Sequence, residues 1–181
     1  MMATEDQILT AAADLLEKNG VEGVTTRAVC RAAGITAPTL YRHFGDKDGL
    51  LRAVVAQGVN AFMAHKRANR QTADAMADLR RGWDRWIAFA LERPKLFRLM
   101  VESTRSNPGA TQEAFVIMRA IVERLATEGR LTTDAGTAAR TIWAASNGVL
   151  TLFMQGTPAA EIKPASELLF DALMARLVRP K

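Results

Sequence analysis

Cysteine and histidine are scarce in this 181-residue sequence, which contains one cysteine and two histidines. The single Cys30 excludes an intrachain disulfide, which suits a reducing compartment. His43 and His65 are expected to lie on different exposed helices, so they form no metal cluster and no nucleophile–base pair with the one cysteine. The sequence therefore predicts a protein that is not an enzyme and that requires no metal or other cofactor.

A continuous hydrophobic run long enough to span a membrane is also missing. Residues 141–160 carry no charge over 20 positions, about the length that a span needs. Polar and helix-breaking residues interrupt this stretch, namely Ser146, Asn147, Gly148, Gln155, Gly156 and Pro158. We interpret it as a buried helix followed by a loop. The acidic MMATEDQ segment lacks the apolar core of a signal peptide, so we expect a cytoplasmic protein without a membrane partner.

The composition is that of a globular protein with a basic balance. Hydrophobic residues make up 49% of the chain, and the net charge is +5 with a pI near 9.9. A basic protein of this kind can bind an acidic partner such as nucleic acid. The first 50 residues, however, contain five Lys/Arg and seven Asp/Glu, a net charge of −2. Bulk charge therefore does not locate a site, and the local arrangement of residues must.

Helical periodicity runs through almost the whole chain, and no alternation typical of strands is present. Capping residues, glycines and prolines divide the sequence into segments. They predict an all-α fold of about nine helices: residues 4–19, 25–33, 36–45, 46–66, 72–92, 94–102, 111–128, 133–155 and 165–178. In the first of these, Thr4 and Gln7 form a capping box, and Asn19-Gly20 is expected to end the helix.

The stretch GITAPTLYRHFGDKDGLL, residues 34–51, follows a short helix and predicts a helix-turn-helix element. Gly34 provides the tight turn between its two helices. Cys30 fits the crossing of these helices as a small packing residue. The inward positions of the two helices are Val29, Ala33, Ile35, Leu40 and Phe44.

The second helix of this element is unusually polar. Leu40 and Phe44, one turn apart, dock it on the core, and the opposite face is free for contacts. Pro38 is tolerated in the first helical turn, which lacks intrahelical N–H partners. The N-terminal part of such a helix enters the DNA major groove, where Thr reads base edges and Tyr or His contacts phosphates or bases. The expected face consists of Thr36, Ala37, Pro38, Thr39, Tyr41 and His43.

Lys47 is the sharpest indication of a phosphate partner. A lysine at a helix N-terminus is disfavoured by roughly 0.3–1 kcal/mol, but a bound phosphate reverses that effect. Thr26 and Arg27, in the first turn of the preceding helix, provide a second phosphate contact. Two alternatives stay open, a half-buried core role for Tyr41 and a solvated surface role for His43. Solvated faces are also the expected location of Arg31 and Arg42.

Residues 4–55 resemble the DNA-binding segment of the tetracycline-repressor (TetR) family of bacterial transcriptional regulators. The motifs Thr-Thr-Arg, Ala-Gly, Leu-Tyr-x-His-Phe and Lys-Asp-x-Leu fall in register within residues 25–55. The sequence departs from a common family pattern at Ala37-Pro38, where many relatives have Lys or Arg followed by Gly. The resemblance implies DNA-contact positions at Thr26, Thr36, Thr39, Tyr41, His43 and Lys47. It divides the chain into a DNA-binding domain, residues 1–50, and a helical effector-binding and dimerisation domain, residues 51–181, joined by a long helix.

The second domain resembles a TetR subgroup with a Trp-x3-His-Gly signature. Trp143, Asn147 and Gly148 fit that spacing, with Asn in place of His. The resemblance implies a mostly apolar cavity for a small effector. Its predicted wall consists of Trp83, Trp86, Phe89, Met118 and Trp143, with Asn147 or Arg119 as a polar contact. The alternative for each apolar residue is an ordinary place in the hydrophobic core.

The last two helices are predicted to form a dimer interface. Small residues on one and an apolar stripe on the other would pack into a four-helix bundle with a second copy. The alternative is that both helices only cover the core of one chain. The residues concerned are Ala144, Ala145, Gly148, Leu152, Leu168, Leu169, Ala172, Leu173 and Leu177.

These features predict a homodimeric repressor of a palindromic DNA operator, released by a small hydrophobic effector. The expected effect of the effector is a shift of residues 94–102 against the long fourth helix. Two alternatives remain open: a helical bundle that carries a ligand or lipid without specific DNA binding, and a transcriptional activator of the same fold.

Overall fold

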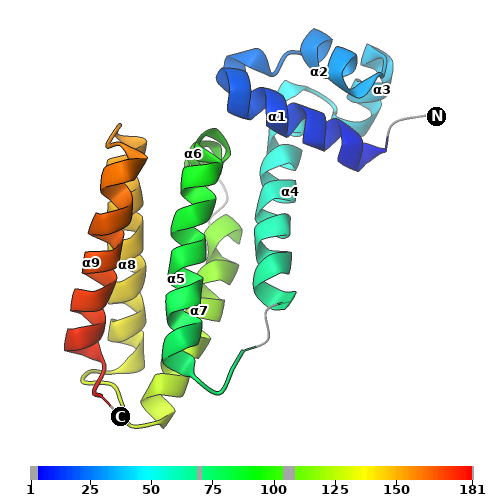
Figure 1. Cartoon of the computed structure of the whole chain (residues 1–181). Helices are drawn as coiled ribbons and strands as arrows, with labels where there is room; N and C mark the ends of the chain where they lie inside the picture. The colour runs from blue at the N-terminus through cyan, green and yellow to red at the C-terminus, as the bar shows by residue number, and fades with distance from the viewer. Residues whose placement is uncertain (1–3, 69–70, 104–108, 181) are drawn as a thin grey trace. The chain divides into compact units, whose positions relative to one another are not determined.

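The structure, a computed structural model, describes residues 4–68, 71–103 and 109–180, and this part of the chain confirms the predicted all-α fold (Figure 1). None of its helices is long and apolar enough to cross a membrane. Its helices are α1 (Glu5–Gly23), α2 (Thr26–Ala33), α3 (Ala37–Phe44), α4 (Lys47–Ala68), α5 (Ala75–Glu92), α6 (Pro94–Ser103), α7 (Gly109–Thr127), α8 (Ala135–Met154) and α9 (Ala159–Leu177).

The helices pack into two compact units. The first comprises Met1–Ala64 with Arg93–Ala110, and the second comprises His65–Glu92 with Thr111–Lys181. Helix α6 therefore belongs with the N-terminal helices, although it follows α5 in the sequence. This grouping differs from the predicted functional division between residues 50 and 51, which stays a prediction.

In the first unit, α1 buries one apolar face. Ile8, Ala12 and Leu16 are completely inaccessible to solvent. The predicted capping box is present, because Thr4 Oγ1 accepts from Gln7 N (3.4 Å) while Gln7 Oε1 accepts from Thr4 N (2.8 Å). The predicted interruption of the helix at Gly20 is confirmed, because Gly20 has the non-helical angles φ 73° and ψ −175°. A second short helical segment, which the sequence does not predict, follows it to Gly23.

Short capped turns join α2, α3 and α4. Thr25 Oγ1 accepts from Ala28 N (3.2 Å), and Gly34 adopts φ 66°, which few other residues would tolerate. Asp46 Oδ1 accepts from Gly49 N (2.6 Å) at the start of α4. Of the predicted inward positions, Val29 and Leu40 are buried, whereas Ala33, Ile35 and Phe44 are only half-buried, as is Cys30.

The second unit consists mainly of α5, α7, α8 and α9, and α9 packs against both α8 and α5 (Figure 1). Helix α9 begins at Ala159, whereas the sequence analysis placed its start at residue 165. Pro164 lies inside the helix and removes one backbone hydrogen bond. Ile162 is 1% exposed, so apolar burial holds the first turns in place despite the proline.

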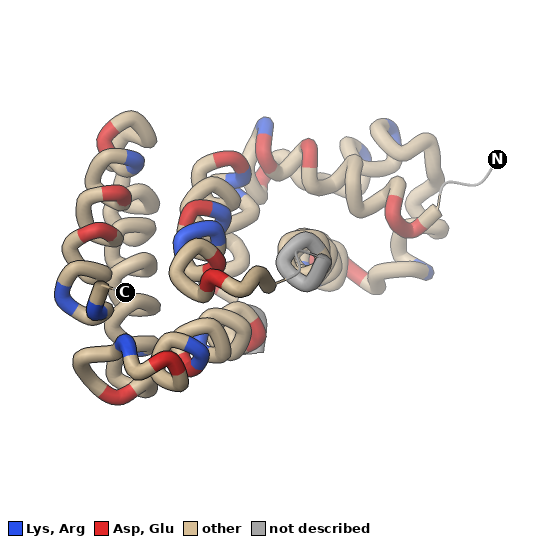
Figure 2. The backbone as a smooth tube through the Cα atoms, turned by 60° about the horizontal axis from the view of Figure 1, so that its bottom comes forward, with Lys and Arg blue, Asp and Glu red and all other residues tan. Residues whose placement is uncertain are grey.

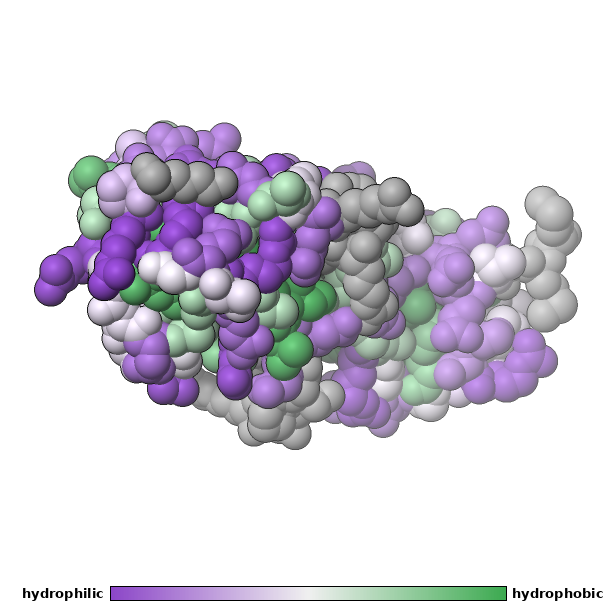
Figure 3. Space-filling view, turned by 90° about the horizontal axis from the view of Figure 1, so that it is seen from below, coloured by the Kyte–Doolittle hydropathy of each residue, from purple (hydrophilic) through white to green (hydrophobic). Residues whose placement is uncertain are grey.

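Hydrophilic side chains cover most of the face shown in Figure 3, and hydrophobic ones form small patches.

A buried carboxylate joins three segments of the second unit. Asp78, in the first turn of α5, accepts hydrogen bonds from Thr72 N (3.0 Å), Thr72 Oγ1 (3.0 Å) and Arg124 of α7 (2.7 Å). It also pairs with Arg81. Burial alone would raise the pKa of Asp78, but the hydrogen bonds from Arg124 and Thr72 and the charge of Arg81 together lower it. The carboxylate is therefore held ionised inside the unit.

Candidate nucleic-acid interface and ligand cavity

Helix α3 has one anchored face and one accessible face. Leu40 is 4% exposed, whereas Tyr41 is 49% exposed although it is a large aromatic residue. Thr36, Pro38 and His43 are also exposed, and Ala37 and Thr39 are half-buried. The predicted contact residues of α3 thus share a helix that is held by Leu40 and is accessible on its other side.

Hydroxyl groups fix the positions of several of these side chains. Tyr41 Oη lies 3.2 Å from Thr26 Oγ1, which links α3 to the first turn of α2. Thr36 Oγ1 lies 3.1 Å from Thr39 Oγ1 and makes no capping bond to the backbone. The structure therefore brings the predicted contacts of α2 and α3 together into one polar surface.

His43 has a neighbour that sequence reasoning missed. Its Nδ1 atom lies 3.9 Å from Glu5 Oε2 of α1, and its ring lies 5.9 Å from the Phe44 ring. His43 and Glu5 are 38 positions apart, so no local sequence pattern could have paired them. Glu5 of α1 thus places a carboxylate near a predicted phosphate contact.

Lys47 is the first residue of α4 and is half-buried. No ion pair involves it within the described residues, and Asp46 uses its carboxylate to cap Gly49. Gly49 itself is a contact that the sequence analysis missed: a Cβ there would lie 1.9 Å from Phe44 O. The glycine allows the end of α3 to touch the first turn of α4, which places Lys47 close to α3.

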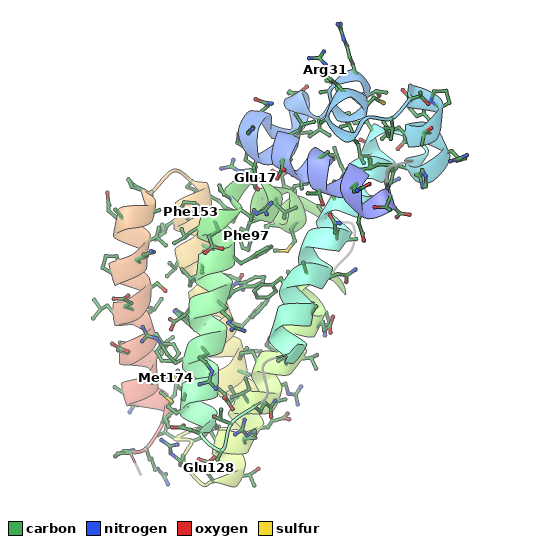
Figure 4. All side chains as sticks on the ribbon, turned by 45° about the vertical axis from the view of Figure 1, so that its right-hand side comes forward. Glu17, Arg31, Phe97, Glu128, Phe153 and Met174 are labelled. Carbon is green, nitrogen blue, oxygen red and sulfur yellow. The ribbon has the colours of Figure 1, made fainter. Side chains whose placement is uncertain are left out.

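Other basic residues of the first unit are exposed. Arg27 and Arg42 are accessible to solvent, and Arg31 points away from α2 (Figure 4). Acidic and basic residues alternate along the helices of the chain (Figure 2). A nucleic-acid interface on this unit would therefore depend on a few well-placed cations and not on a broad positive field.

Helix α6 is attached to both α1 and α4. Glu17 of α1 accepts hydrogen bonds from Leu96 N (2.9 Å) and Lys95 N (3.4 Å) at the start of α6 (Figure 4). Lys95 Nζ donates back to Lys18 O (2.9 Å). On the other side, a Cβ at Gly58 of α4 would lie 2.6 Å from Leu96 Cδ2. A displacement of α6 would therefore change its contacts with both α1 and α4.

A small apolar cavity lies among α5, α7 and α8 of the second unit. Its volume is ≈ 30 Å³, enough for about one water molecule. All three tryptophans of the chain line it, together with Met118. The complete lining is Leu79, Gly82, Trp83, Trp86, Met118, Ile121, Ile142, Trp143 and Ser146.

Three other residues considered for this pocket are not among its lining. The Phe89 ring stacks with the Trp86 ring at a centroid distance of 6.4 Å. Asn147 Nδ2 donates to Trp143 O within α8 (2.8 Å). Arg119 pairs with Glu123 on the exposed side of α7 (2.8 Å). None of the three lines the cavity, so neither Asn147 nor Arg119 offers it a polar contact in this structure.

The outer surface of α8 and α9 carries exposed apolar side chains. Leu168 is 73% exposed and Leu152 is 50% exposed. Gly148 is exposed, and an added Cβ would meet nothing within 4 Å. Ala144 and Ala172 are exposed, and Ala145, Leu169 and Leu173 are half-buried. Leu177 differs, because at 8% exposure it belongs to the core of its own chain.

Comparison with known families matches both parts of the chain. The profile described as "Bacterial regulatory proteins, tetR family" matches residues 8–54, and the "Tetracyclin repressor-like, C-terminal domain" profile matches residues 79–177. The chain belongs to the TetR family. These are regulatory proteins, which agrees with the prediction that the chain is not an enzyme.

Individual relatives agree with this assignment. The chain is 32% identical over 113 residues to the class A tetracycline repressor of transposon 1721 from Escherichia coli, covering 58% of this chain and 47% of that protein. The chain thus spans about half or less of the length of the curated relatives it matches. SmeT, the repressor of the Stenotrophomonas maltophilia multidrug efflux pump SmeDEF, is 26% identical with a TM-score of 0.78, covering 98% of this chain and 91% of SmeT. A Saccharomonospora viridis protein in complex with choline shares the fold, with a TM-score of 0.83 at 17% identity, covering 97% of both chains.

Proposed function

We propose that the chain is a homodimeric transcriptional repressor that binds a palindromic DNA operator in the cytoplasm and is released by a small hydrophobic effector. The observation that carries the proposal is the accessible polar surface of Thr26, Thr36, Thr39, Tyr41 and His43 beside Lys47. A helix anchored by Leu40 and accessible on its other face suits the major groove. Two copies would read half-sites about one helical turn apart, ~34–36 Å between centres.

Selection of duplexes from a random pool tests the proposal directly. The expected result is a palindromic consensus bound by the purified chain with two chains per duplex. Enrichment of no sequence would contradict specific DNA recognition and favour the ligand-carrying alternative. Enrichment of a single half-site bound by one chain would contradict the dimeric arrangement. Placing the consensus before a reporter gene then separates repression from activation.

Lys47→Ala is expected to weaken binding similarly on all duplex sequences, because a phosphate contact carries no base information. The slope of log affinity against log salt should fall by about 0.9, the value for one released counterion. Fluorescence anisotropy at several salt concentrations measures it. Arg31→Ala is the matched control, since Arg31 projects from the same unit on α2 (Figure 4). Equal slopes for Lys47→Ala and the parent would remove Lys47 from the contact surface.

Thr39→Ala is expected to change base preference instead of overall affinity. Its hydroxyl lies 3.1 Å from Thr36 Oγ1, and in this proposal it contacts a base edge. Discrimination at one or two operator positions should fall by roughly 1 kcal/mol, or about fivefold. Repeating the duplex selection with the variant measures this change. An identical consensus for variant and parent would show that Thr39 is not a reader.

The path from effector to DNA runs through α6 in this proposal. A single residue, Arg93, separates the end of α5 from the start of α6. Because the two helices are joined so closely, a change in the position of α5 would displace α6 as well. Glu17 and Leu96 then transmit the displacement to α1 and α4. The effector must bind the released state better than the DNA-bound state, with a coupling of roughly 1–3 kcal/mol.

The dimer in this proposal forms through α8 and α9. Leu152 and Leu168 are the exposed large apolar residues of these two helices, and packing against a second copy would bury both. The open space beside Gly148 allows a facing helix to approach closely. A four-helix bundle of α8 and α9 from two copies satisfies these features.

A further inference from the structure

We propose that the cavity of the second unit selects a flat, uncharged aromatic molecule, and that Gly82 sets the size of the ring it admits. This inference rests on the proposed effector role of the cavity. It names the chemical class of the effector and a residue that determines specificity. Three features carry it: the charge of the wall, the arrangement of its rings and the open space beside Gly82.

No charged side chain among the described residues lines the cavity to form an ion pair with an ionised ligand. Of its described residues, eight are glycine or carry apolar or tryptophan side chains, and the ninth is Ser146. A buried charge without a partner is strongly disfavoured. Ser146 is 4% exposed, and its hydroxyl donates to Trp143 O (2.9 Å). The hydroxyl oxygen retains acceptor capacity, so it can accept a hydrogen bond from a neutral ligand.

Aromatic rings at and around the cavity contact one another in a connected set of pairs. Trp86 lies between Phe89 (6.4 Å, 29°) and Trp143 (5.5 Å, 32°). Phe115 meets Trp143 edge-on at 5.7 Å and 71°. Trp83 is fixed separately, because its Nε1 donates to Ser166 Oγ (2.8 Å). Aromatic pairs gain from offset stacking or edge contacts beyond simple area burial, so a flat ring extends this arrangement better than an aliphatic group of equal volume.

Gly82 determines where the cavity can enlarge. Residues 79, 82, 83 and 86 fall on one face of α5, and all four line the cavity. A Cβ at Gly82 would meet nothing within 4 Å, so packing in this state does not require the glycine. Glycine inside a helix destabilises it relative to alanine. The missing side chain instead leaves open space at this position of the lining.

The present volume also requires an opening step. A space of ≈ 30 Å³ is far below the roughly 300–1,000 Å³ of pockets that hold drug-sized ligands. An aromatic ligand must therefore move the rings apart. The cavity can enlarge at Gly82, because this residue has no side chain and has open space beside it. Movement of Trp83 and Trp86, both on α5, links ligand entry to the helix that precedes α6.

Titration calorimetry with four probes of similar size tests the ligand class. The probes are 4-nitroanisole, cyclohexyl methyl ether, choline and 4-nitrobenzoate, which are respectively flat and neutral, aliphatic and neutral, cationic, and anionic. We expect 4-nitroanisole to bind at least tenfold more tightly than each of the others. It should also change the tryptophan fluorescence, because all three tryptophans line the cavity. Equal or tighter binding of choline or of the aliphatic ether would overturn the proposal.

Gly82→Ala tests the role of the glycine. The variant should bind 4-nitroanisole at least tenfold more weakly, with an unfolding temperature equal to or above that of the parent. Gly136→Ala adds the same methyl group to a helical position outside the cavity, where it would approach only the side chains of Asp134 and Arg140, and it should bind the probe like the parent. Unchanged binding by Gly82→Ala would contradict the assignment. Affinity of Gly82→Ala for the selected duplex should stay unchanged, and its measurement separates failure of this inference from failure of the proposed DNA-binding function.

Discussion

Asp78→Ala is expected to lower the free energy of unfolding by roughly 3 kcal/mol, the lower end of the range for breaking a buried ion pair. The Asp78 side chain is 5% exposed, and its removal leaves Arg124 and the Thr72 N–H without their acceptor. Arg124 is 28% exposed, so water compensates part of the loss. Urea denaturation monitored by circular dichroism measures the change.

Asp84→Ala is the matched control for that variant. Asp84 pairs with Arg80 in the same helix, but its side chain is 51% exposed. An exposed pair contributes only about 0.2–1 kcal/mol, so the control should lose less than about 1 kcal/mol. Equal losses for the two variants would show that the Asp78 cluster contributes no more than a surface pair.

The Asp78 cluster also predicts a pH dependence of stability. The folded-state pKa of Asp78 lies below its ordinary value of 3.8, so the unfolded chain binds the proton more readily. Its contribution is therefore complete above pH 3.8 and is lost as the pH falls from there through the lower folded pKa. Asp78→Ala should lack this component. Unfolding curves of parent and variant across that acid range should converge as the pH falls.

Gly148→Arg is expected to convert the protein to monomers and to weaken operator binding by about 100-fold or more. An arginine side chain would fill the open space beside Gly148. It would also put a charge into the proposed interface, which contains Leu152 and Leu168. A monomer contacts only one half-site, so it loses the gain in affinity from linked binding, which reaches roughly 10²–10⁴-fold. Analytical ultracentrifugation measures the mass, and anisotropy measures the affinity for DNA.

A second arginine variant controls for the added charge. Ala126 is exposed on α7, outside α8 and α9, so Ala126→Arg should remain dimeric and bind DNA like the parent. A dimeric Gly148→Arg would place the interface elsewhere. A monomeric variant that retained full operator affinity would instead show that DNA recognition does not require the pair.

Local structure was largely predictable because its signals lie within a few residues of one another. The Thr4–Gln7 capping box, the Gly34 turn and the Asp46 cap each depend on contacts over three or four positions. The anchoring of α3 by Leu40 follows from helical periodicity in the same way. The start of α9 was missed because burial of Ile162 outweighs the local effect of Pro164.

Contacts between distant segments could not be predicted from one sequence. Glu17 meets Leu96 across 79 positions and Asp78 meets Arg124 across 46, and no periodicity encodes such pairs. The glycines carried a weaker signal. Gly49 and Gly58 are required by close approach of Phe44 O and Leu96, whereas Gly82 faces open space, and the sequence does not distinguish these cases.

The half-buried Cys30 on α2, the one thiol in the chain, offers a natural attachment point for a spin label. In a pair of chains it would give one nitroxide on each DNA-reading unit and hence a single interspin distance. Pulsed electron resonance would then follow the separation of the two reading heads in solution, with and without a bound aromatic compound, and no engineered cysteine would be needed.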